Sequence, residues 1–359
     1  MKTLLYLFYG GKSVEYEVSL KTAFTALQSI DLHKYTVYPI HIARDGRWSC
    51  SGALERAISS IEELTASQSG RTSVAASIGQ LLSTIFNQEG KKVVLPMLHG
   101  TGGEDGTLQG MMELLDIPYV GNGVLSSAMA LDKAVCKTIL QQAGIAQIEH
   151  LTYSWRDWKL YGEQVSGQIE QTIGYPCYVK PASLGSSVGI SRCQQRSELD
   201  AALSEAFRFD RKIVVERDAC AREIQVAVMG NDHPAASWPG EFIHEGSFFH
   251  YEAKYLDPQL QMSIPADLPA SITEQIRETA VKAYTALGCS GLARVDFFVD
   301  GRQQIYLNEI NTMPGFTNCS MYPVMWERTN GTSYGELIER LIDYALERHL
   351  ERQSIEYAR

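Results

Sequence analysis

The feature that most constrains the fold is a β-hairpin predicted near the C-terminus, over residues 293–316. This segment reads ARVDFFVDGRQQIYLNEINTMPGF. Its Asp300-Gly301 pair, flanked by strand-like runs, is a strong short-range signal for a hairpin turn. Folding the second strand back on the first places Asp296 opposite residues 307–309. The hairpin therefore predicts a pair of long strands in a C-terminal sheet.

One face of the second strand carries the candidate metal ligands. Side chains two apart on a strand point to the same face, so Glu309 and Asn311 should share a face with Ile305 and Leu307. Together with Asp296 they offer only hard oxygen donors, which suit Mg²⁺ rather than Zn²⁺. Mg²⁺ held by few carboxylates usually completes its octahedron with phosphate oxygens and water, which indicates a nucleotide. The alternative is a surface hairpin with solvated acids, since acids are common in turns.

Length, charge and cysteine content narrow the class of protein. The chain has 359 residues, 45% of them hydrophobic, which is enough for two or three packed domains. A net charge of −10 argues against a nucleic-acid partner, which normally requires a basic face. The seven cysteines are odd in number and include no C-x-x-C pair, which fits reduced thiols rather than disulfides or a structural zinc. No stretch approaches the ~20 apolar residues of a membrane span, so we expect a cytoplasmic enzyme without a membrane partner.

The order of predicted elements divides the chain into three parts. Strands predicted at 3–9, 36–42 and 93–98 alternate with helical segments, which is typical of a parallel α/β domain. A helix at 132–142 leads into a second, α+β part, with strands at 175–181, 189–192 and 213–216 and a helix at 197–207. The third part contains a strand at 222–228, a helix at 271–287, the hairpin and a terminal helix at 335–349. Residues 55–90 show weak periodicity, and the role of residues 45–92 and 153–172 is left open.

Two glycine-containing segments are candidates for phosphate binding. Gly10-Gly11-Lys12-Ser13 is not a Walker A motif, because Tyr6 stands where that motif needs its first glycine. The helix that follows begins near Glu15, whose carboxylate could complement the helix dipole or bind a substrate ammonium group. Residues 179–190 read VKPASLGSSVGI and predict a flexible lid between two strands, whose N–H groups and hydroxyls can cover phosphates. A tight turn is the alternative.

Two further loops carry polar side chains of open function. Residues 99–106 place four glycines around a histidine and two acids, directly after a predicted buried strand. Ligand contact would justify the entropy lost in ordering such a loop, whereas the alternative is a structural turn that caps the next helix. Residues 251–255, YEAKY, lie in a loop where a Lys-Tyr pair is usually solvated surface.

In this order, the motifs resemble those of the D-alanine–D-alanine ligases of the ATP-grasp superfamily. The resemblance runs over nearly the whole chain and rests on residues 10–20, 99–110, 131–133, 179–189, 251–255, 293–298 and 308–317. It implies an α/β and α+β fold with three-domain ATP-grasp architecture. The implied parts are an N-terminal Rossmann-like parallel-sheet domain at 1–121, a central ATP-grasp subdomain with the Gly/Ser-rich lid at 122–221, and a C-terminal ATP-grasp subdomain with the Mg-binding hairpin at 222–359. A homodimer is also implied.

The resemblance further implies the reaction and the residues that perform it. ATP and two D-alanines would give D-alanyl-D-alanine, ADP and phosphate through a D-alanyl phosphate, supplying peptidoglycan synthesis. Two Mg²⁺ ions, replaceable by Mn²⁺, would be held by Asp296, Glu309 and Asn311. ATP would contact Lys133, Lys180, Ser183, Ser186, Ser187, Glu216, Glu223 and Lys254. The D-alanines would contact Glu15, His99, Ser320 and Met321. Arg294 and the Gly315 N–H would form the oxyanion site, and Glu15, Ser186 and Tyr255 a hydrogen-bonded trio that ties the lid to the first domain.

Three other readings remain at this stage. Close relatives join D-alanine to D-serine or D-lactate, and Tyr255 matches the dipeptide-forming type. Another ATP-grasp ligase would share the metal hairpin and the lid but would have no reason to keep residues 99–110 and Glu15. A nucleotide-binding regulator without chemistry would not need the full set of charges that the motifs supply.

Overall fold

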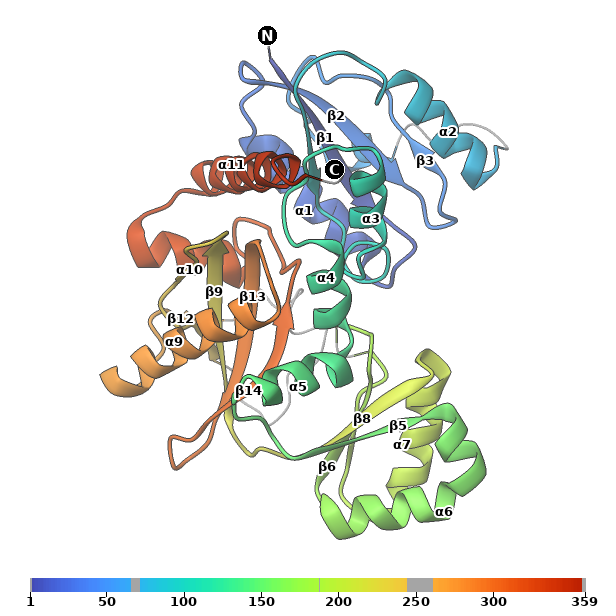
Figure 1. The fold of residues 1–359 in the computed structure, drawn as a ribbon, viewed down its shortest axis with the longest axis vertical. Coiled ribbons are helices and arrows are strands. Elements are labelled where there is room, and N and C mark those ends of the chain that lie inside the picture. Colours follow the sequence, from blue (N-terminus) through green and yellow to red (C-terminus); the bar gives the residue numbers. More distant parts are fainter. Residues whose placement is uncertain (1, 66–71, 187, 244–260, 357–359) are drawn as a thin grey trace.

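The structure of the chain is a computed structural model, and it describes residues 2–65, 72–186, 188–243 and 261–356. Figure 1 shows a parallel sheet with β1 and β2 at the top, an antiparallel sheet with β9, β13 and β14 in the middle, and a smaller sheet with β5, β6 and β8 below. Within the described residues, no helix is both long and apolar enough to cross a membrane.

The N-terminal sheet has the order β3-β2-β1-β4, and its three longer strands run parallel, as predicted. The central strand β1 is buried from Leu4 to Gly10, which explains its unbroken apolar run. The strands are β1 (Thr3–Gly10), β2 (Tyr35–Ile42), the short antiparallel β3 (Trp48–Ser49) and β4 (Lys92–Pro96). The helices are α1 (Tyr16–Ser29), the 3₁₀ turn η1 (Ile61–Leu64), α2 (Val74–Thr84) and α3 (Thr107–Leu114).

The central part is an antiparallel sheet of order β5-β8-β6-β7, with two helices packed on it. Its strands are β5 (His150–Ser154), β6 (Cys177–Pro181), β7 (Ser191–Cys193) and β8 (Lys212–Arg217). Helices α4 (Val124–Leu131) and α5 (Lys133–Gln142) lead into it, and α6 (Trp155–Thr172) and α7 (Arg196–Phe209) cover it. The segment 153–172, left open by the sequence pattern, is therefore mostly the helix α6. Its start is set by a capping box between Ser154 and Asp157.

The C-terminal sheet has the order β10-β9-β13-β14 and is antiparallel. Its strands are β9 (Arg222–Gly230), β10 (Ala235–Ala236), β13 (Gly291–Val299) and β14 (Ile305–Asn311), beside the small pair β11 (Glu241–Ile243) and β12 (Gln261–Ser263). The helices are α9 (Ala270–Ala286), α10 (Met321–Asn330) and α11 (Tyr334–Gln353). The helix α10 was not anticipated from the sequence.

The hairpin β13–β14 forms as predicted, with Asp296 paired to Glu309, and the structure adds two details. The connection spans residues 300–304, and the left-handed residue is Gln303, at φ 63°, rather than Gly301. The strand pairing also shifts between Asp296 and Phe297, whose partner is Leu307. This bulge inserts an extra residue and breaks the simple alternation of faces.

The bulge separates the apolar side chains of β14 from the polar ones. Leu307 and Ile310 both pack into the core beside α9, at 1% and 3% exposure. Glu309 and Asn311 are instead partly exposed. The predicted shared face of Ile305, Leu307, Glu309 and Asn311 is therefore wrong, because the alternation holds only while the register is unbroken.

The N-terminal sheet and the C-terminal part share one hydrophobic core. Helix α11 packs against α1 and β4 as well as against β9 and β13, and Figure 1 shows it lying beside the N-terminal sheet. At the same junction, the Asn122 amide donates to the carbonyls of Leu292 and Thr312, at 2.6 and 3.2 Å. The crossing segment near the predicted boundary at 121/122 is thus fixed to the C-terminal sheet, which sets the position of the loops that face the site.

Candidate active site

The end of the β13–β14 hairpin gathers charged and amide side chains. Arg294 lies opposite Asn311, and Asp296 lies opposite Glu309. The Arg294 guanidinium donates two hydrogen bonds of 2.7 Å to the Asp296 carboxylate, one to each oxygen. The Asn311 side-chain oxygen accepts the Met313 N–H at 3.0 Å and so shapes the loop that follows. All four predicted hairpin residues therefore lie together.

The donor set at this hairpin end fits a hard divalent cation. It consists of the carboxylates of Asp296 and Glu309 and the amide oxygen of Asn311, which are oxygens of the kind that Mg²⁺ prefers. Among the described residues, no three His, Cys, Asp or Glu side chains form a metal-binding group. A Mg²⁺ ion here would thus need further oxygens from phosphate or water, as expected beside a nucleotide.

Lys133 connects the hairpin to the lid. Its helix α5 starts there because the Asp132 carboxylate accepts the N–H groups of Ala134 and Val135, at 3.1 and 3.2 Å. The Lys133 ammonium donates to the Leu184 carbonyl in the lid at 2.7 Å and lies 3.6 Å from the Glu309 carboxylate. One lysine therefore contacts both the predicted phosphate cover and a predicted metal ligand.

Lys180 and Glu216 form a buried ion pair on the central sheet. Lys180 enters from β6 and donates to one Glu216 oxygen, and Lys137 of α5 lies 2.7 Å from the other. Burial disfavours the Glu216 carboxylate, but the two lysines outweigh that effect and hold its pKa well below the usual range. Likewise, burial opposes the charged Lys180, yet Glu216 keeps the Lys180 pKa above its ordinary value.

The lid reaches the N-terminal domain through Ser186. Its hydroxyl donates to the Glu15 carboxylate, and the residue adopts a left-handed φ of 54°, which is uncommon outside glycine. Glu15 stands directly before α1 and is 6% exposed. The predicted Glu15–Ser186 contact is thus present. Tyr255, the third predicted member, lies outside the described residues, as do Lys254 and Ser187.

Gly100 makes room for the Glu15 carboxylate. It has a φ of 71°, and a Cβ placed on it would lie 2.6 Å from a Glu15 oxygen and 2.7 Å from the Ser13 hydroxyl. A side chain at this position would therefore both strain the backbone and displace the carboxylate. The glycine-rich loop 99–106 is built around Glu15.

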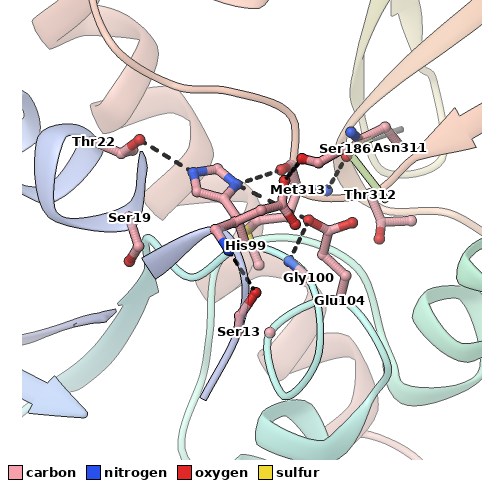
Figure 2. Close-up of polar contacts among 12 residues, drawn as sticks. Ser13, Ser19, Thr22, His99, Gly100, Glu104, Ser186, Asn311, Thr312 and Met313 are labelled. Carbon is pink, nitrogen blue, oxygen red and sulfur yellow. Dashed lines mark hydrogen bonds and ion pairs between the residues drawn. The ribbon is translucent and has the colours of Figure 1, made fainter. Parts of the chain in front are cut away.

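His99 and Glu104 lie on the same loop and face the site, as Figure 2 shows. The His99 Nδ1 lies 3.0 Å from the Met313 carbonyl, which can only accept, so Nδ1 carries the hydrogen. The other ring nitrogen, Nε2, then accepts the Thr22 hydroxyl at 3.1 Å. Burial lowers the pKa of His99, which favours this neutral form.

Glu104 is buried at 8% exposure and receives the Gly100 N–H at 2.9 Å. Burial, helped by the nearby Glu15 carboxylate, raises the pKa of Glu104 to about 8. The carboxyl group is therefore mainly protonated at neutral pH. Asp105 next to it has the structural role, because it accepts the N–H groups of Gly102 and Thr107 at the start of α3. Asp105 therefore fits the structural-turn reading of the loop, and ligand contact by His99 or Glu104 stays a prediction.

The remaining predicted residues occupy more varied environments. The Ser183 N–H donates to Asp210 at 2.7 Å, which anchors the lid, and Glu223 is exposed on β9. Gly315 is partly exposed in the loop after β14. The Ser320 hydroxyl lies 2.7 Å from the Thr317 hydroxyl, directly before α10. Met321, in the first turn of α10, is 3% exposed in the shared core, which leaves it little surface for a substrate.

Glu104 and Lys137 were missed by the sequence reasoning. Glu104 was visible as one of two acids in the glycine-rich loop, but nothing in the pattern separated it from Asp105. Lys137 stands four residues after Lys133, a spacing that places both on one helix face. That signal was available, although it could not show which carboxylate Lys137 meets.

Comparison with known proteins gives a consistent result over the whole chain. Residues 5–122 match the family model described as D-ala D-ala ligase N-terminus, and residues 139–343 match D-ala D-ala ligase C-terminus. A curated D-alanine–D-alanine ligase of Geobacillus thermodenitrificans is 46% identical over 361 residues, covering 99% of both chains. One from Listeria innocua is 47% identical over 367 residues, again covering 99% of both.

Solved structures agree with this result. The D-alanine–D-alanine ligase from Coxiella burnetii aligns with a TM-score of 0.79 at 35% identity, covering 98% of this chain and 96% of that one. The VanG D-Ala:D-Ser ligase from Enterococcus faecalis aligns with a TM-score of 0.78 at 32% identity, covering 96% of this chain and 100% of that one. These likenesses confirm the predicted ATP-grasp fold class.

Proposed function

Because this chain belongs to the D-alanine–D-alanine ligase family, we propose that the site described above joins two D-alanines at the expense of ATP. The first D-alanine carboxylate attacks the γ-phosphate, which yields D-alanyl phosphate and ADP. The amine of the second D-alanine then attacks the activated carbonyl and releases phosphate. The product would supply peptidoglycan synthesis.

Glu15 binds the ammonium group of the first D-alanine in this proposal. Its carboxylate is buried, is held by Ser186, and lies beside the glycine loop that carries His99. A buried carboxylate is stabilised by a cationic partner, and a substrate ammonium would supply one. The neutral His99 and the mainly protonated Glu104 place no second negative charge there, so a single ammonium balances the subsite.

Phosphoryl transfer depends on positioning and on neutralising charge. Lys133 and Lys180, which the structure describes, are assigned to the phosphates of ATP. Lys254, which lies outside the described residues, is assigned to the γ-phosphate. The lid, with Ser183, Ser186 and Ser187, covers them, while Glu216 and Glu223 lie toward adenine and ribose. Asp296, Glu309 and Asn311 would hold Mg²⁺, or Mn²⁺ in its place, which when bound neutralises the phosphate oxygens.

The second step needs hydrogen-bond donors aimed at the oxyanion of a tetrahedral intermediate. Arg294 and the Gly315 N–H are assigned this role, with Ser320 and Met321 at the second D-alanine. Arg294 is already fixed by both Asp296 oxygens. A preorganised guanidinium of this kind costs little reorganisation when charge develops. The hairpin β13–β14 then serves both half-reactions.

One observation carries this proposal: the lid contacts two separate parts of the site at once. Ser186 donates to Glu15 of the N-terminal domain, and the neighbouring Leu184 carbonyl accepts Lys133, which lies near Glu309. The lid therefore connects the proposed ammonium subsite at Glu15 with the phosphate-covering loop and the proposed metal ligands of the hairpin. A closed lid also excludes water, which would otherwise hydrolyse an acyl phosphate.

The test is turnover with D-alanine, D-serine and D-lactate offered singly and together with ATP and Mg²⁺. We expect phosphate release that depends on D-alanine, with D-alanyl-D-alanine as the main product by mass spectrometry. A main product containing D-serine or D-lactate would change the second substrate but keep the ligase assignment. No D-alanine-dependent phosphate release would contradict the proposal altogether. A homodimer and a cytoplasmic location complete the proposal and are open to sedimentation and fractionation.

A further inference from the structure

Lys137 is a buried cation that the proposed reaction does not use. It stands one turn after Lys133 on α5, and its side chain is 2% exposed. Its ammonium lies 2.7 Å from the Glu216 Oε1 atom, while Lys180 takes Oε2. The Lys137 contact is therefore a close ion pair with Oε1, and it helps to hold the pKa of Glu216 low. One buried carboxylate thus has two lysine partners.

The two lysines differ in what else surrounds them. The negative charges of Glu309 on β14 and Glu223 on β9, which face the site, also act on Lys180. Lys137 is the more deeply buried of the two, with its side chain 2% exposed against 10% for Lys180, and its charge acts on the His150 ring of β5. Lys180 is therefore the partner that borders the nucleotide site, and Lys137 the one behind it.

Moving Lys180 toward a phosphate has a consequence for Glu216. A carboxylate that is 3% exposed cannot recruit water easily, so losing its only cation would strand a buried charge. With Lys137 in place, the carboxylate keeps one cation when Lys180 leaves. With both lysines present, Lys180 can leave Glu216 for a phosphate oxygen. With Lys180 alone, the same movement would leave the buried carboxylate without a cation.

We propose that Lys137 is a positioning residue: it holds Glu216 so that Lys180 can leave this carboxylate and bind a phosphate oxygen of ATP. This inference rests on the proposed function, because it assumes that Lys180 faces the phosphates. Lys137 does not touch the substrate and acts only through Glu216. Without it, Lys180 stays on Glu216 and the phosphates lose a cation.

The first test compares ligands that do and do not carry phosphates. Binding of a non-hydrolysable ATP analogue and of adenosine is measured by calorimetry, in magnesium buffer, for the wild type, Lys137→Met and Lys137→Arg. We expect Lys137→Met to weaken the ATP analogue about 30-fold, which is roughly 2 kcal/mol, and to leave adenosine within about threefold. Lys137→Arg should restore most of the loss. Lys159→Met, on the exposed side of α6, is the control and should bind as the wild type does.

Equal weakening of both ligands, or of neither, would overturn the inference, since a packing defect does not distinguish phosphates from adenosine. The second test covers the case in which Lys137→Met alone does not fold. In a Glu216→Gln background there is no carboxylate to strand, so adding Lys137→Met should change binding of the ATP analogue less than threefold. A further tenfold loss in that background would show that Lys137 acts in another way.

The failure of this inference can be told apart from failure of the proposed function. D-alanine-dependent phosphate release by the wild type is measured on the same preparation. If the wild type neither binds ATP nor turns over, the proposed function fails. If it does both and Lys137→Met matches it, only the role of Lys137 fails.

Discussion

Replacing Glu104 by glutamine should change how the stability of the protein depends on pH. Glu104 is buried beside Glu15, and its pKa is raised to about 8 from an ordinary value of 4.5. Between these two pH values the folded protein holds one proton more than the unfolded chain. Glu104 therefore stabilises the fold most below pH 4.5, and this contribution is lost as the pH rises through 8. Glutamine keeps the shape and the hydrogen-bonding capacity but does not titrate.

The size of the effect follows from the proton balance. One extra bound proton makes the free energy of unfolding fall by about 1.4 kcal/mol per pH unit. From pH 6.5 to 8.0, allowing for partial ionisation near the upper end, the wild type should lose about 1.5 to 2 kcal/mol through Glu104. The lowered pKa of His99 acts mainly at and below that group's ordinary value of 6.5, and it is common to the wild type and the variant, so it cancels in their comparison. The Glu104→Gln variant should lack this part of the slope.

The assay is urea unfolding of the ligand-free protein at pH 6.5 and 8.0, followed by tryptophan fluorescence. The measured quantity is the change in unfolding free energy between the two pH values, wild type minus variant. Glu205→Gln, a surface glutamate paired with Arg208 on α7, is the matched control and should keep the wild-type slope. Equal slopes in the wild type and Glu104→Gln would refute the reasoning, because Glu104 would then ionise alike in both states.

The remaining predictions concern the site and its scaffold. Glu309→Gln should abolish D-alanine-dependent phosphate release, since the proposed Mg²⁺ site loses one of its two carboxylates. A wild-type rate in this variant would overturn the assignment of Glu309 as a metal ligand. Ser186→Ala removes a hydrogen bond to a carboxylate and should lower kcat/KM about 10- to 100-fold; initial rates at low D-alanine measure this, and an unchanged value would count against lid closure on Glu15. Gly100→Ala places a Cβ 2.6 Å from a Glu15 oxygen at a φ of 71°, so both stability, by about 1 to 3 kcal/mol, and D-alanine affinity should fall, as followed by urea unfolding and KM. Asp132→Ala should destabilise the fold by about 1 kcal/mol through loss of the α5 cap, whereas Asp132→Asn, which still caps, should cost less; equal losses in the two variants would exclude capping as the cause.

Local signals were sufficient wherever a short stretch of chain decides its own conformation. The start of α5 at Lys133 could be predicted because Asp132 caps it within three residues. The pairing of Asp296 with Glu309 could be predicted because a hairpin brings near neighbours together. The parallel sheet around β1 followed from an apolar run followed by a glycine turn and a helix.

The sequence was insufficient where one residue of register or a distant partner decided the outcome. The bulge in β14 placed Leu307 and Glu309 on different faces, and no local pattern marks where a ladder slips by one residue. The burial of Met321 depends on the core shared by α11 and the N-terminal sheet, which joins segments far apart in the chain. The distinction between Glu104 and Asp105 depends on which carboxylate faces Glu15, and that is set by the path of the loop.

The sequence by itself determined the types and order of most elements outside α6 and α10, the family, and the identity of most charged groups in the site. These properties depend on motifs and periodicities within short segments, so they can be recognised without knowing how distant segments pack. Beyond the predicted Glu15–Ser186 contact, only the tertiary structure decided which charges meet: Lys133 lies between the lid and Glu309, and Lys137 and Lys180 share Glu216. Such pairings are long-range, and their energies depend on burial, which exists only once the parts of the chain pack together.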